Sequence, residues 1–150
     1  MLWRMTPIIR ETPLAVTLVG ASGKHDPAKS YGPEIIGLLN RVWPVVKAGA
    51  IPNKGINWAE YGENGEIFAG IEADIPDPAA VGLERRTVRL AKYAEWKHIG
   101  SYSKLGETYD ALYKAVGAMG LRAGRPLVEM YGHWTNDESK LETTILLSVA

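Results

Sequence analysis

Hydrophobic and polar residues alternate in several short stretches of the chain, which is the pattern of β-strands with one buried face. Residues 67–75 carry isoleucine or alanine at every second position, with aromatic, glycine and acidic residues between them. Residues 56–63 precede them, and Glu63-Asn64-Gly65-Glu66 is a hairpin signal because Asn-Gly favours a tight turn. Further strands are predicted at 8–12, 14–19, 87–99, 127–134 and 142–149, with Pro13 at an edge or bulge and 20–32 as a polar loop.

Two other stretches have the three-to-four-residue spacing of amphipathic helices. The first follows Pro33, which suits a first helical turn, and Pro44 inside it predicts a kink or an early end. The second begins near Ser101 or Ser103 as N-cap and stops at Gly120. The apolar stripes are Ile35, Leu38, Leu39, Val42, Val45 and Val46 in the first helix, and Leu105, Tyr109, Leu112, Val116 and Met119 in the second.

The order of these elements is β-α-β-β followed by β-α-β-β, and Tyr-Gly recurs at equivalent places, 61–62 and 131–132. The predicted fold class is therefore α+β: one domain, 1–150, of two pseudo-symmetric halves, approximately 6–76 and 85–150, with a mainly antiparallel sheet. Two helices cover only one face of such a sheet. We expect both on one face, against Ile71, Ala73, Ile145 and Leu147, and a ligand groove on the other.

Composition narrows the classes of function. The 17 basic and 17 acidic residues cancel without forming blocks, so no direct nucleic-acid binding is expected. Cysteine is absent, which excludes disulfides and thiolate chemistry, and the three histidines lack metal-ligand spacing, so neither a metal nor a cofactor is expected. No apolar run approaches the length of a membrane span and residues 1–7 lack the apolar stretch of a signal peptide, so a cytoplasmic location is expected.

The stretch 127–134 holds the candidate chemistry. Alternation puts Glu129 on one face with Leu127, Tyr131 and His133, opposite Val128, Met130 and Trp134. A carboxylate beside an aromatic side chain can anchor a ligand, and the alternative is that Glu129 simply faces solvent. Five tryptophans and seven tyrosines against a single phenylalanine favour a cavity of mixed polarity, because most of these aromatic side chains carry a polar atom that needs a partner.

Three passages resemble a known family, the GyrI-like small-molecule-binding domains, which also occur as effector-binding domains of AraC- and MerR-type transcription regulators. Residues 93–102 are similar to its Y-x-x-x-x-H-x-G-x-Y passage, except that Ser101 stands where the family often has proline. Tyr109-Asp110-Ala111-Leu112-Tyr113 follows in register, and residues 126–131 resemble its P-x-x-E-x-Y strand. The resemblance implies a groove between the halves with Glu129 at its base, where some members contact hydrophobic cations.

Aromatic faces beside such a carboxylate favour cations. The candidates for these faces are Tyr131, Trp96, Trp58, Tyr61 and Phe68. The leading hypothesis is a stand-alone protein that binds hydrophobic or aromatic small molecules, cations included. The resemblance implies two alternatives: a hydrolase of cyclopropane-bearing genotoxins with Glu129 and Tyr131 as catalytic residues, and a transcription-related or protein-interaction module with a partner such as DNA gyrase. The identity of the ligand and the oligomeric state stay open.

Overall fold

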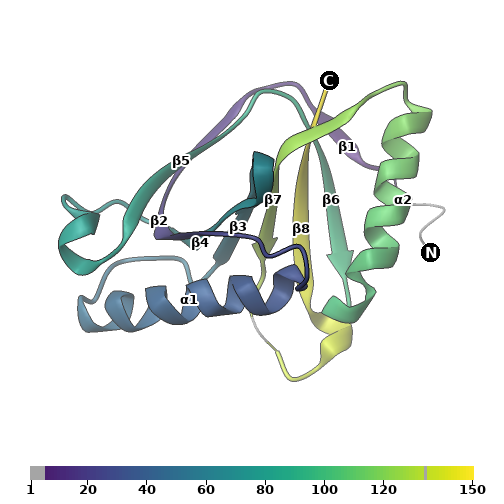
Figure 1. The fold of residues 1–150 in the computed structure, drawn as a ribbon. Helices are drawn as coiled ribbons and strands as arrows, with labels where there is room; N and C mark the ends of the chain where they lie inside the picture. Colours follow the sequence, from purple (N-terminus) through teal and green to yellow (C-terminus); the bar gives the residue numbers. More distant parts are fainter. Residues whose placement is uncertain (1–5, 134) are drawn as a thin grey trace.

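The computed structural model describes residues 6–133 and 135–150, so the N-terminal residues 1–5 and Trp134 lie outside the described part. Within it, eight strands form one antiparallel sheet with two α-helices (Figure 1), which confirms the α+β class. The strands are β1 (Ile8–Arg10), β2 (Leu14–Lys24), β3 (Asn57–Tyr61), β4 (Glu66–Glu72), β5 (Glu84–Leu90), β6 (Tyr93–Ile99), β7 (Ala123–Tyr131) and β8 (Glu142–Val149), and the helices are α1 (Tyr31–Ala48) and α2 (Leu105–Ala118).

The strand order is β1-β6-β8-β7-β3-β4-β2-β5, and its two halves mirror each other. In each half the strand after the helix, β3 or β7, lies at the centre of the sheet. The last strand of the half, β4 or β8, lies next to it, and the strand before the helix, β2 or β6, comes third. The two flanking strands are exchanged: β1 pairs with β6 of the second half, whereas β5 pairs with β2 of the first.

The register of the central pair β3–β7 places a pseudo-twofold axis between Ala59 and Glu129. Tyr61 and Tyr131 are 70 residues apart. Under that relation the facing pairs Asn57–Tyr131 and Tyr61–Leu127 exchange, and the pair Ala59–Glu129 maps onto itself. A carboxylate in one half therefore faces a methyl group in the other.

Both helices pack on one face of the sheet, as the sequence predicts (Figure 1). Ile35, Val42 and Val46 of α1 and Leu112 and Val116 of α2 are all buried in one cluster. That cluster also contains Ile71, Ile145 and Leu147 of the sheet, and Ala73 packs against it. None of the helices in the described part is both long and apolar enough to cross a membrane.

The opposite face of the sheet holds a second hydrophobic cluster rather than a groove. No helical residue belongs to it, and its members bury one another across seven strands: Leu18, Trp58, Phe68, Val88, Leu90, Tyr93, Val128 and Leu146. The expectation of a ligand groove on this face is therefore wrong. Alternation shows which residues share a face, but it does not show which of the two faces stays open.

Residues 20–24 of the expected loop 20–32 are instead strand, because two glycines let the backbones of β2 and β4 approach closely. Gly20 faces Gly70, and a Cβ on Gly20 would lie 2.0 Å from the Ala69 carbonyl oxygen. β2 consequently continues to Lys24. The strand expected at 87–99 is also different: it divides at Ala91 and Lys92 into β5 and β6, which lie in different halves of the sheet.

The helix ends differ in part from the predictions. Pro44 does not end α1, which continues to Ala48. Ser101 caps a short 3₁₀ turn, Tyr102–Lys104, and α2 begins only at Leu105. The buried ring of His98 on β6 holds this start, with Nδ1 2.6 Å from Thr108 Oγ1 and Nε2 2.9 Å from the Ser101 carbonyl oxygen. The strand expected at 127–134 begins earlier, at Ala123, and ends at Tyr131.

Candidate functional site

A pocket of about 690 Å³ lies on the helix-bearing side of the sheet, between α1 and α2. Its floor comes from the central strands β3 and β7, where the two halves meet. Apolar side chains from both helices form part of the wall, among them Ile35, Leu39 and Leu105. Six of the seven tyrosines in the chain also line it: Tyr31, Tyr61, Tyr102, Tyr109, Tyr113 and Tyr131.

Three tyrosine hydroxyls converge on the carboxylate of Glu129 at the floor. Tyr61 donates to Oε1 at 2.8 Å, Tyr109 donates to Oε2 at 2.5 Å, and Tyr131 also donates to Oε1. They come from three elements, β3, α2 and β7, so only the folded chain assembles them. The glutamate is 5 % exposed, and it does not face open solvent.

The charge of Glu129 is balanced by neutral donors alone. Burial, and secondly the Glu129 charge, raise the pKa of Tyr61, Tyr109 and Tyr131 above that of an ordinary tyrosine, so all three remain protonated donors. Among the residues that the structure describes, no lysine, arginine or histidine forms an ion pair with this carboxylate. The pocket therefore has a stabilised negative charge and no cation of its own beside it.

The structure brings together only part of the residues predicted from the sequence. Glu129, Tyr131 and Tyr61 meet at the pocket floor. Trp96 lies on the same side of the sheet, but it is packed in the core and does not line the pocket. Trp58 and Phe68 lie in the cluster on the opposite face, so they have no access to the pocket.

Four further lining tyrosines were not among the ligand-contacting residues predicted from the sequence. Tyr109 and Tyr113 are one turn apart on α2, a spacing that puts them on one side of a helix. Tyr31 and Tyr102 lie near the starts of the two helices, in corresponding places of the two halves. The sequence does show that tyrosine recurs near both helices. That these tyrosines line one pocket becomes clear only when both helices are seen to lie beside the same strands.

Ring stacking and hydrogen bonds outside the pocket support Tyr31, which lines the pocket wall. The His25 ring stacks on Tyr31 with ring centroids 3.7 Å apart, and Tyr31 meets the ring of Tyr61 edge-on at 5.1 Å. Glu34 holds the histidine, with Oε1 2.5 Å from Nδ1, and also accepts from the Asp26 backbone N–H at 2.9 Å. This network connects the start of α1 to the floor residue Tyr61.

A Glu34→Gln variant is expected to lose stability at neutral pH but not in acid. The Asp26 N–H, and secondly His25, lower the pKa of Glu34 below its reference value of 4.5. A lowered folded-state pKa stabilises the fold above the unfolded-state pKa, and the effect disappears as the pH falls through the folded value. Thermal melts should therefore separate wild type from the variant at pH 7, and the difference in Tm should shrink steadily as the pH is lowered below 4.5. A gap of the same size across this range would contradict this role.

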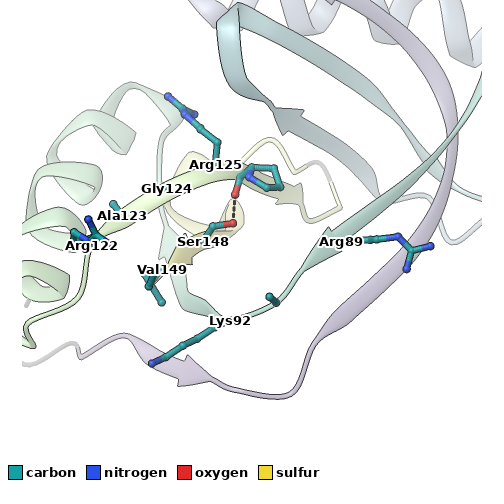
Figure 2. A pocket seen from close by; sticks show the side chains of 11 residues that line it. Arg89, Lys92, Arg122, Ala123, Gly124, Arg125, Ser148 and Val149 are labelled. Atoms are coloured by element: carbon teal, nitrogen blue, oxygen red, sulfur yellow. Dashed lines mark hydrogen bonds between the residues drawn. The ribbon is translucent and has the colours of Figure 1, made fainter.

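A second, shallower depression of about 490 Å³ lies where β7 begins, beside the turn between β5 and β6. Its basic residues are Arg89, Lys92, Arg122 and Arg125 (Figure 2). The side chains point in different directions around the depression, so they do not converge on one bound anion. Within the described residues no group of three metal-ligating side chains is present.

The family model described as "GyrI-like small molecule binding domain" matches residues 61–150. No curated protein matches the sequence of this chain. Among solved structures, the C-terminal domain of EcmrR is similar with a TM-score of 0.71 and 16 % identity, covering 97 % of this chain and 99 % of that one. SAV2435 bound to tetraphenylphosphonium has a TM-score of 0.67 and 17 % identity, covering 97 % and 94 %. A hydrolase from Listeria innocua has a TM-score of 0.62 and 12 % identity, covering 97 % and 92 %.

Proposed function

Because the chain belongs to the family of GyrI-like small molecule binding domains, we propose that its tyrosine-lined pocket binds hydrophobic aromatic cations, with Glu129 as the counter-charge. The observation that carries the proposal is the buried carboxylate that has three hydroxyl donors and no cationic partner in the described residues. A ligand cation in the pocket would supply the missing full charge.

The expected energies favour a cation over a neutral ligand of the same shape. A unit charge about 4 Å from a carboxylate gains roughly 4 kcal/mol at an effective dielectric constant of 20. An aromatic face adds about 0.5–2 kcal/mol for a cation above it. The pocket volume also lies in the range usual for drug-sized ligands.

The hydrogen bonding of Glu129 favours binding over hydrolysis. A general base must offer a free oxygen lone pair to the water that it activates. Here both oxygens already accept hydroxyl donors, and Oε1 accepts two of them. Three of the roughly four lone-pair positions of the carboxylate are therefore occupied by tyrosine hydroxyls, which leaves little room for a water to be activated.

The test compares two probes of the same shape and opposite charge. Tetraphenylphosphonium, the ligand of the similar SAV2435 structure, is titrated calorimetrically beside the tetraphenylborate anion. We expect the cation to bind and the anion to bind at least about 100-fold more weakly, because it would face the uncompensated carboxylate. Equal affinity for the two ions would refute the role of Glu129 as counter-charge. Binding of neither ion would refute the proposal that this pocket binds hydrophobic aromatic cations.

A further inference from the structure

The pocket also has one positive charge, far from its floor. Arg125 lies on β7 four positions before Glu129 and lines the same pocket. It is exposed, whereas the glutamate is buried. Within the described residues its guanidinium forms neither a hydrogen bond nor an ion pair. A strand rises about 3.3 Å per residue, so the two residues start no more than about 13 Å apart.

Arg125 lies at the border between two hollows, because it lines both the tyrosine pocket and the neighbouring depression. Leu127 and Glu129, two and four positions after Arg125, line the tyrosine pocket as well, although the register between β7 and β8 shifts between Ala123 and Leu127. In Figure 2 the Arg125 side chain extends away from Ser148 and Lys92, which lie around the neighbouring depression. Arg122 lies around that depression as well and does not line the tyrosine pocket.

We propose that the pocket accepts zwitterionic aromatic ligands, with the ligand cation at Glu129 and a ligand carboxylate or other acidic group at Arg125. The proposal rests on the cation site described above and adds a second, oppositely charged contact at the exposed end. Guanidinium groups bind carboxylates through paired hydrogen bonds. The same charge repels a second ligand cation, so compounds with a single cationic group are favoured over dications.

Two dyes with the same xanthene cation test this contact. Rhodamine 110 carries a free carboxylate on its pendant ring, whereas rhodamine 123 carries the methyl ester and only the positive charge. Both are titrated calorimetrically into wild type, Arg125→Gln and the control Arg122→Gln, which removes the same charge from a residue outside the pocket. We expect Arg125→Gln to weaken rhodamine 110 about fivefold relative to rhodamine 123, the upper end for an exposed ion pair. Arg122→Gln should leave the ratio of the two dissociation constants unchanged.

The outcomes separate this inference from the function on which it rests. If Arg125→Gln weakens both dyes equally or neither, the zwitterion contact is refuted while binding of tetraphenylphosphonium still supports the cation site. If wild type binds tetraphenylphosphonium but neither dye, the inference is also refuted. If Arg122→Gln changes the ratio as much as Arg125→Gln, the effect is a general one of surface charge, and Arg125 has no specific contact.

Discussion

Glu129→Gln is expected to weaken tetraphenylphosphonium binding by roughly 10- to 150-fold, or about 1.5–3 kcal/mol, the usual range for a contact to a charged group. Glutamine has nearly the same shape, and its carbonyl oxygen still accepts from a tyrosine hydroxyl. The variant therefore removes the charge and leaves the pocket in place. Calorimetric titration of both proteins measures the effect, and a thermal melt checks that the variant is folded.

The matched control is Glu72→Gln, which removes a carboxylate from the same sheet at a place outside the pocket. Glu72 pairs with Lys54 at the surface. Its loss should leave the affinity for tetraphenylphosphonium unchanged. If Glu129→Gln had no more effect than this control, the cation would bind elsewhere and the three tyrosines would have only a structural role.

Gly70→Ala is expected to lower stability by at least about 3 kcal/mol, the upper part of the range for overpacking in a rigid interior. The new Cβ would lie 2.3 Å from the Val19 carbonyl oxygen. Only a shift of the backbone of β2 or β4 could relieve this contact, because no flexible side chain is involved. For a chain of this length the corresponding loss in Tm is about 6–12 °C, measured by calorimetry or circular dichroism.

Gly37→Ala provides the opposite case with the same substitution. Gly37 lies within α1, and a Cβ there would meet nothing within 4 Å. Alanine is the better helix former, so the variant should be more stable by up to about 1 kcal/mol. If Gly70→Ala melted at the same temperature as wild type, the backbones of β2 and β4 could not be as close as described.

Most of the elements and their order can be predicted from the sequence alone, because they depend on local spacing, but the division of 87–99 into β5 and β6 cannot. The Asn-Gly hairpin and both amphipathic stripes follow from neighbouring residues, and the correspondence of Tyr61 with Tyr131 follows from the repeated order of elements. The site depends on distant residues instead. Tyr61 and Glu129 are 68 positions apart, and Tyr109 reaches the carboxylate from a helix. No pattern along the chain indicates that these three side chains meet.

The choice of sheet face shows the same limit. Alternation correctly separates Trp58 from Tyr61 and Val128 from Glu129. It does not reveal that the helix-free face closes on itself, because this depends on how the whole sheet bends. Trp58 and Phe68 are aromatic and look suitable for a ligand, yet they fill that closed face. Their identity reflects packing rather than binding.

The position of Glu129 opposite Ala59 restricts how a chain with two equivalent halves can evolve a binding site. Facing residues on neighbouring antiparallel strands have Cβ atoms only about 4.5–5.5 Å apart, and like charges placed there repel each other. Two ionised acids facing each other there would repel, and the methyl group of Ala59 opposite Glu129 avoids this repulsion. The centre of this pocket floor therefore carries its charge on one half of the chain only, and a symmetric ligand bound there would meet a carboxylate on one side and a methyl group on the other.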